Sequence, residues 1–262
     1  MPSVEGAGVE LAYDERGEGE PVVLVHGTGA ERGFWAETVA ALGDGVRAIA
    51  YDRRGYGRSG APEPYTATTV GEHADDLAAL IGALAAEPAV LCGHSFGALV
   101  ALELLLHEPR LARAAVLIDP GMLWLAPSGA AEASRVRAAA EEAARERGPA
   151  GAIDAFIAAT SGERARETLG EERFAAVHAR PVSFMAEVAA AGAWSPAPRE
   201  LRALEAPVTL LAGTRSSQVW HEVNEALEAM LPRAELRWVE GGHLLPIEAP
   251  AAVAEAIRSL QP

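Results

Sequence analysis

The sequence of 262 residues contains no lysine, so that all 22 of its basic residues are arginines. Schiff-base catalysis, pyridoxal-phosphate chemistry and P-loop ATPase chemistry each need a lysine amine. The missing lysine therefore excludes these three classes of enzyme. A composition rich in alanine and arginine is also typical of a protein from a GC-rich bacterial genome.

Cysteine and long hydrophobic runs are scarce as well. Cys92 is the only cysteine, so the chain can form neither an internal disulfide nor a zinc site built on several cysteines. No apolar stretch approaches the ~20 residues that a membrane-spanning helix needs. The first twenty residues also lack a basic segment followed by an apolar one, which would indicate a signal peptide. We therefore expect a cytoplasmic protein with no membrane partner.

Positive charge is in deficit, because the formal net charge at pH 7 is −15. Nucleic-acid binding relies on basic side chains that neutralise phosphates, so the charge argues against a nucleic-acid partner. The expected partner is a small-molecule substrate. The sequence gives no indication of an oligomeric state.

Apolar runs of strand-like composition alternate with helical patterns along most of the chain. Near-continuous apolar strands that are each followed by a helix are typical of a parallel sheet covered on both faces. The first two runs are expected to form a hairpin or meander. The strand-like runs are 9–13, 21–27, 46–52, 89–93, 114–119, 208–213 and 234–240, and the helical patterns are 34–42, 70–86, 96–107, 218–231 and 249–260.

One segment, residues 121–202, interrupts this alternation. It contains helical patterns rich in Ala, Glu and Arg and no good strand, and Gly148-Pro149, Gly162 and Pro181 divide it into pieces. We interpret it as a helical insertion after the sixth strand. The predicted organisation is a core in two parts, 1–120 and 203–262, with the insertion between them.

A Gly-x-Ser-x-Gly pattern at Gly93–Gly97 lies between an apolar strand and a helical pattern. This context is typical of a sharp turn that exposes a nucleophilic serine at the end of a strand. Glycines on either side suit such a turn because its backbone is strained and crowded. The alternative is that Ser95 only caps the helix. We favour Ser95 as a nucleophile.

Three further loops follow predicted strands. "VHGTG" at 25–29 is a glycine-rich turn in which the Thr28 amide could pair with that of Phe96 to bind an oxyanion. "VEGGHLLPIEAP" at 239–250 places His243 just after the last strand. "YDRRGYGRSG" at 51–60 superficially resembles a dinucleotide loop, but no helix follows it, so we reject that interpretation.

Taken together, these pieces resemble the α/β-hydrolase family. The matching elements are "HGTG" at 26–29, "DRRGYGRS" at 52–59, "GHSFG" at 93–97 and "GGHLLPIEAP" at 241–250, in the family's order. The resemblance implies a mostly parallel eight-stranded sheet with helices on both faces and a helical cap at 121–202. It also implies Ser95 as nucleophile, His243 as base, and the amides of Thr28 and Phe96 as oxyanion donors. It implies neither a metal nor an organic cofactor.

The acid of the expected triad departs from the family's usual pattern. Ser216 stands where that family usually carries a carboxylate after the seventh strand. Asp119, at the end of the sixth strand in "AAVLIDP", is a substitute that resembles the arrangement in many haloalkane dehalogenases. Glu222, or no acid at all, are the alternatives. A serine nucleophile makes dehalogenation itself improbable.

The function implied is cleavage of an ester, thioester or lactone bond in a small to medium apolar substrate. Two alternatives remain: a non-hydrolytic reaction on the same fold, such as elimination, cyclisation or carbon–carbon cleavage, and a binding scaffold without turnover. Large apolar side chains suggest an apolar substrate pocket. The candidates are Trp35, Met122, Leu123, Trp124, Phe156, Phe184, Met185 and Trp194.

Overall fold

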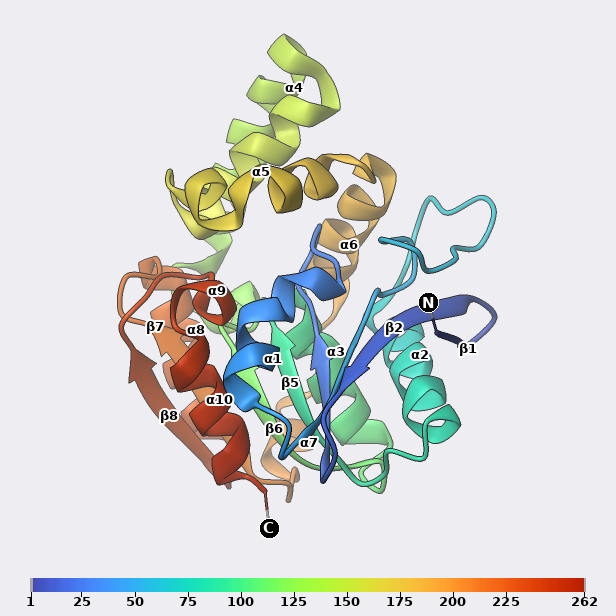
Figure 1. The fold of residues 1–262 in the computed structure, drawn as a ribbon. Helices are drawn as coiled ribbons and strands as arrows, with labels where there is room; N and C mark the ends of the chain where they lie inside the picture. The colour runs from blue at the N-terminus through green and yellow to red at the C-terminus, as the bar shows by residue number, and fades with distance from the viewer. Residues whose placement is uncertain (1, 262) are drawn as a thin grey trace.

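The computed structural model describes residues 2–261. These residues form one eight-stranded sheet with helices packed around it (Figure 1). The strand order is β1-β2-β4-β3-β5-β6-β7-β8, with β1 and β2 antiparallel to their neighbours and the rest parallel. The strands are β1 (Ser3–Glu5), β2 (Glu10–Arg16), β3 (Pro21–Val25), β4 (Arg47–Tyr51), β5 (Ala89–His94), β6 (Ala112–Ile118), β7 (Val208–Gly213) and β8 (Ala234–Val239). This arrangement confirms the predicted fold class.

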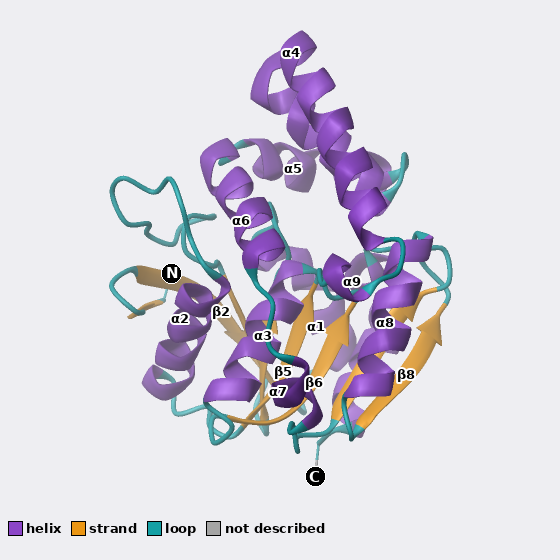
Figure 2. Ribbon diagram, turned by 180° about the vertical axis from the view of Figure 1, so that it is seen from behind, coloured by secondary structure: helices purple, strands orange, loops and turns teal. Residues whose placement is uncertain are grey.

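Helices cover both faces of the sheet, as Figures 1 and 2 show from opposite sides. Alternate residues of a strand face opposite sides, so Val22 and Leu24 of β3 join one core while Val23 and Val25 join the other. The first core includes side chains of α1 (Ala36–Leu42) and α10 (Pro250–Ser259). The second includes side chains of α2 (Val70–Ala83), α3 (Phe96–His107) and α8 (Gln218–Met230).

The start of the chain departs from the expected hairpin. The two predicted strands correspond to β2 and β3, but β4 lies between them and pairs with both. β3 is buried along most of its length and needs strand neighbours on both sides, which β4 and β5 provide. The partly exposed β2 instead takes the place beyond β4, and the short strand β1, which the sequence pattern did not reveal, pairs with it.

The segment between β6 and β7 is helical, as predicted, and lies over the carboxyl ends of the strands (Figures 1 and 2). A backbone break at Gly148, with φ 69°, divides its long first helix in two, as Gly148-Pro149 predicted. The helices of the segment are η2 (Leu123–Leu125), α4 (Gly129–Ser161), α5 (Ala165–His178), α6 (Pro181–Ala193) and α7 (Pro198–Arg202). The core also contains the short helices η1 (Arg32–Trp35) and α9 (Leu245–Glu248).

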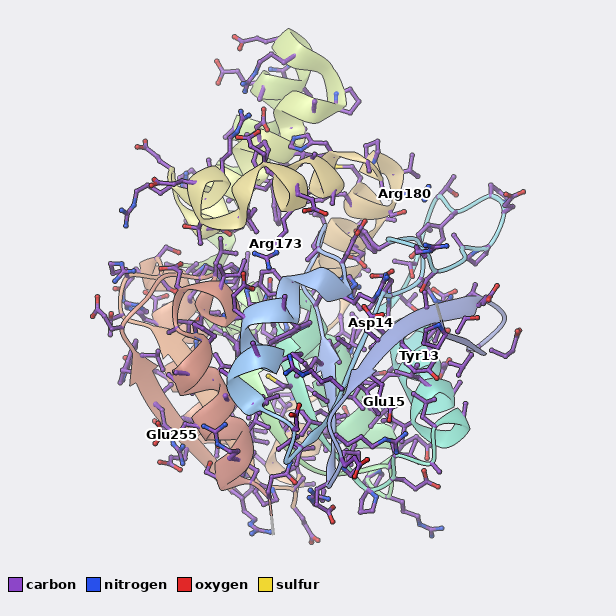
Figure 3. All side chains as sticks on the ribbon, in the orientation of Figure 1. Tyr13, Asp14, Glu15, Arg173, Arg180 and Glu255 are labelled. Carbon is purple, nitrogen blue, oxygen red and sulfur yellow. The ribbon has the colours of Figure 1, made fainter. Side chains whose placement is uncertain are left out.

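The polar links between this segment and the core include two arginine–glutamate ion pairs. On α5, Arg173 donates to both carboxylate oxygens of Glu37 on α1, at 2.9 and 2.7 Å, and Figure 3 shows it between the two helices. On α6, the buried Glu187 pairs with Arg53 of the loop after β4. Within residues 2–261, no helix is long and apolar enough to cross a membrane.

Candidate active site

Ser95 occupies a strained corner between β5 and α3. Its φ of 52° and ψ of −114° lie in a region that residues other than glycine rarely adopt. A Cβ at Gly93 would lie 2.4 Å from the carbonyl oxygen of Gly97, and a Cβ at Gly97 would lie 2.1 Å from that of Val25. Both flanking positions therefore require glycine, because Gly93 lies against the first turn of α3 and Gly97 lies against the end of β3.

His243 and Asp119 meet at the same edge of the sheet. The Nδ1 atom of His243 lies 3.1 Å from Oδ2 of Asp119, and both side chains are buried. A carboxylate can only accept, so Nδ1 carries a proton and Nε2 is the unprotonated nitrogen of the neutral ring. His243 and Ser95 line one common cavity.

Two more side chains hold the Asp119 carboxylate. The Ser216 hydroxyl donates to Oδ2 at 2.6 Å, and the Asn224 amide donates to Oδ1 at 3.0 Å. Ser216 thus occupies the expected position of the acid but acts as a donor to Asp119. Asn224, on α8, was missed by sequence reasoning because an isolated asparagine in a helical pattern carries no signal.

Glu222, the alternative acid, has other partners. Its Oε2 accepts from the backbone amide and the hydroxyl of Ser128, at 2.8 and 2.7 Å. These hydrogen bonds lower the pKa of the Glu222 carboxyl, which lies at the surface. The structure thus places Asp119, and not Glu222, against the imidazole of His243.

Aromatic rings fix the orientation of His243. Trp220 stacks on its imidazole with ring centroids 4.5 Å apart and planes at 15°. On another side, Nε2 of His94 donates to the carbonyl oxygen of His243 at 2.8 Å. Burial, followed by the positive charge that His243 can carry, sets the pKa of His94 well below its usual value. His94 is therefore a neutral donor.

The turn after β3 lies directly beside the serine corner. A Cβ added at Gly27 would lie 3.2 Å from Cβ of Ser95, which measures how closely the two loops approach. Thr28, Ser95 and Phe96 line one cavity. Phe96 is the first residue of α3, so its amide has no partner within the helix.

Arg53 supports this turn from beneath. Its guanidinium donates to the carbonyl oxygens of His26 and Gly27, each at 2.9 Å, and lies 4.8 Å from the ring centre of Phe96. It also pairs with both carboxylate oxygens of Glu187. Burial raises the pKa of Glu187, and the charge of Arg53 opposes that effect. Sequence reasoning missed both residues, since the pair joins positions 134 apart in the chain.

The next position, Arg54, also has a buried partner. Its Nε and Nη2 atoms donate to the two carboxylate oxygens of Asp76 on α2, at 2.6 and 2.9 Å. Arg53 and Arg54 of the loop at 51–60 are therefore both engaged by carboxylates of the protein.

Two cavities of unequal size adjoin Ser95. The large cavity, of about 980 Å³, is bounded by Ser95, η2, α4 and α6, and Trp124, Phe156 and Phe184 line it together with Leu123 and Met185. The small cavity, of about 50 Å³, is bounded by Ser95, His243, the turn after β3 and side chains of α4, α5 and α6. Phe156 and Phe184 line both cavities.

Three candidate pocket residues lie elsewhere. Trp35 and Met122 are fully buried. Trp35 belongs to the first hydrophobic core and Met122 to the second, so both pack within a core. Trp194 packs against the second core and donates from Nε1 to Glu103 on α3 at 2.8 Å. None of the three is among the residues that line either cavity in the described part of the chain.

The model of the alpha/beta hydrolase family matches residues 22–256. The chain belongs to this family. A candidate carbamate hydrolase, RutD of Azorhizobium caulinodans, is 33% identical over 119 residues, which are 45% of this chain and 44% of that protein. The matched segments thus span less than half the length of such curated relatives.

Solved structures resemble this alpha/beta hydrolase over almost its whole length. A thermophilic esterase from Thermogutta terrifontis is 28% identical with a TM-score of 0.82, covering 99% of this chain and 97% of that one. Est816, described as an N-acyl homoserine lactone degrading enzyme, is 26% identical with a TM-score of 0.75, covering 98% and 99%. These relatives agree with the expectation of a hydrolase.

Proposed function

We propose that this protein is a serine hydrolase that cleaves an ester, thioester or lactone through an acyl-enzyme on Ser95. The observation that carries the proposal is the contact of 3.1 Å between Asp119 and Nδ1 of His243, in a site that also contains the strained Ser95 corner. Ser95 is the nucleophile, His243 the base and Asp119 the acid that orients it. The amides of Thr28 and Phe96 are the oxyanion donors.

The reaction proceeds in two halves. Nε2 of His243 removes the proton of the Ser95 hydroxyl as its oxygen attacks the acyl carbon, and the two amides stabilise the negative oxygen that develops. His243 then gives its proton to the leaving group as the acyl-enzyme forms. In the second half His243 removes a proton from water as the water oxygen attacks the acyl carbon, and it returns that proton to the Ser95 oxygen as the acid is released.

The segment 121–202 acts as the cap of this site. Its helices α4 and α6 supply most of the wall of the large cavity, whereas the proposed catalytic residues come from the core. The esterase and the lactone-degrading enzyme among the similar structures support an ester or lactone as the substrate bond. The carboxylate beside His243 supports hydrolysis over the non-hydrolytic alternative, because it supplies the acid that a hydrolytic triad uses.

The test is hydrolysis of p-nitrophenyl acetate by the wild-type protein and by Ser95→Ala. We expect Ser95→Ala to lose about 10⁴-fold or more in kcat, since no other group can form the acyl-enzyme. Ser134→Ala, which removes an exposed hydroxyl on α4, is the matched control and should retain the wild-type rate. Equal activity of Ser95→Ala and wild type would rule the proposal out.

A further inference from the structure

The two cavities beside Ser95 differ about twentyfold in volume, at about 980 and 50 Å³. An acyl carbon attacked by Ser95 carries two substituents, the acyl chain and the leaving group, and they must lie in different directions. The shape of the site therefore decides which substituent is the larger one, provided that the two can be assigned to the two cavities.

The position of His243 makes this assignment. The leaving oxygen must accept the proton of His243, so it has to lie within hydrogen-bond reach of the imidazole. His243 lines the small cavity and is not among the residues that line the large one. The leaving group therefore belongs in the small cavity, which has room for about three to five water-sized groups. A small alcohol fits this space, and a bulky alkanol does not. An activated leaving group such as p-nitrophenolate departs as a stable anion without the His243 proton, so this limit does not apply to p-nitrophenyl acetate.

The acyl chain then belongs in the large cavity. One face of α4 lines it from Gly129 to Ala144, which corresponds to roughly 22 Å of helix. Four of the eight residues on this face are alanines, and Arg137 and Glu141 are its two charged residues. Val188 and Ala189 of α6 also line the cavity. The lining of this space is mainly small and apolar, so the space accepts a hydrocarbon chain along α4.

We propose that the substrate is an ester of an elongated apolar carboxylic acid with a small alcohol, the chain of the acid lying between α4 and α6. This inference rests on the proposed function, because it assigns the two sides of the bond that Ser95 attacks. In the first half-reaction the bond between acyl carbon and alkoxy oxygen breaks, and the His243 proton goes to that oxygen. The small alcohol leaves, and water later releases the long acid.

Two isomeric esters test the assignment, because methyl decanoate and nonyl acetate have the same formula and differ only in which side of the ester is long. We expect kcat/KM to be about tenfold or more higher for methyl decanoate, since buried methylene groups each contribute up to about fourfold. Equal values, or a preference for nonyl acetate, would overturn the inference. So would a failure to cleave either isomer while p-nitrophenyl acetate is hydrolysed.

A pair of variants on α4 tests the location of the chain. Ala133→Phe fills the large cavity and should lower kcat/KM for methyl decanoate about tenfold while changing that for p-nitrophenyl acetate less than about twofold. Ala138→Phe, on the exposed face of the same helix, should change neither value. Unchanged turnover of methyl decanoate by Ala133→Phe would contradict this location. If the wild type hydrolysed p-nitrophenyl acetate no faster than Ser95→Ala, the proposed function itself would be contradicted instead.

Discussion

Asp119 is the residue on which the proposed site depends most. It directly follows β6 and has a φ of 41°, a conformation that residues other than glycine rarely adopt. Three donors converge on its carboxylate, from Ser216, Asn224 and His243. Such a network fixes the carboxylate in one orientation and holds the imidazole in the tautomer that catalysis needs.

Replacement of this acid gives the first prediction. Asp119→Asn should lower kcat for p-nitrophenyl acetate about 10⁴-fold, because an amide favours the wrong tautomer of His243. The Ser216 hydroxyl oxygen lies only 2.6 Å from Oδ2 of Asp119, so a carboxylate at position 216 can reach the same imidazole. Adding Ser216→Asp to Asp119→Asn should therefore restore about tenfold or more of the lost rate.

The control for this prediction is Glu222→Gln. Glu222 is bound to Ser128 and does not contact His243, so its variant should keep the wild-type kcat. A kcat for Asp119→Asn within about tenfold of wild type would show that Asp119 does not orient the base.

How much of the site could be predicted depended on the kind of residue. Ser95 and His243 lie in loops with local signals, a glycine-flanked corner and a strand end, and the structure brings both to one cavity. Asp119 could be proposed only as a substitute, since Ser216 held the usual position. The partners Asn224 and Glu187 carry no local pattern, because their contacts join distant parts of the chain.

At the scale of elements, the ion pair between Arg53 and Glu187 links the loop after β4 to helix α6. Both side chains are fully buried. Removal of one partner from such a pair leaves an unpaired buried charge, whereas replacement of both by apolar side chains costs little. The same guanidinium holds the carbonyl oxygens of the turn that carries Thr28, so we treat Arg53 as a positioning residue.

The second prediction separates the contribution of the ion pair to stability from the role of Arg53 in positioning the turn that carries Thr28. Glu187→Met should lower the free energy of unfolding by about 3–5 kcal/mol, and the double variant Arg53→Met/Glu187→Met should recover most of it. The double variant should still lose about tenfold in kcat with KM little changed, because the oxyanion turn has lost its support. Urea unfolding and steady-state kinetics on p-nitrophenyl acetate measure both quantities.

The exposed pair between α5 and α1 is the control for this ion pair. Glu37→Gln removes the partner of Arg173 at the surface and should cost no more than about 1 kcal/mol. If the double variant at positions 53 and 187 had wild-type kcat, the positioning role of Arg53 would be wrong.

At the scale of the whole molecule, the alternation of strands and helices predicted the sheet because each parallel strand is a continuous apolar run. The order of the first strands could not be predicted in the same way. β2 and β3 are neighbours in sequence, but β4 lies between them in the sheet. The order of strands depends on which strand is buried and must pair on both edges, and the local apolar pattern does not show this. The pocket residues were predicted least well, since Trp35 and Met122 have the same apolar character whether they face a core or a cavity.

Three buried histidines give the whole molecule a dependence on pH. Burial, helped by nearby positive charge, sets the pKa values of His26, His73 and His94 well below 6.5. Below pH about 6.5 these histidines bind protons in the unfolded chain but stay unprotonated in the folded protein. Their contribution to stability is therefore complete above that pH and is lost as the pH falls.

The third prediction follows from this uptake. As the pH falls below about 6.5 the slope that each such ring adds approaches about 1.4 kcal/mol per pH unit, so the three together approach about 4 kcal/mol per pH unit near pH 5.5. Urea unfolding at a series of pH values from about 7.5 to about 5.5 measures the slope. His73→Leu should flatten it by one ring's share, and a free energy of unfolding that stayed constant across this range would contradict the prediction.

The most direct test of the central claim, that Ser95 is an activated nucleophile, is intact-protein mass spectrometry after treatment with a fluorophosphonate. Such a reagent is attacked by a serine whose proton is removed by a base and whose developing charge is bound by an oxyanion site. We predict a single adduct on the wild-type protein, located at Ser95 by peptide mapping, and none on Ser95→Ala or His243→Ala. An unlabelled wild-type protein, or one labelled at another residue, would contradict the claim.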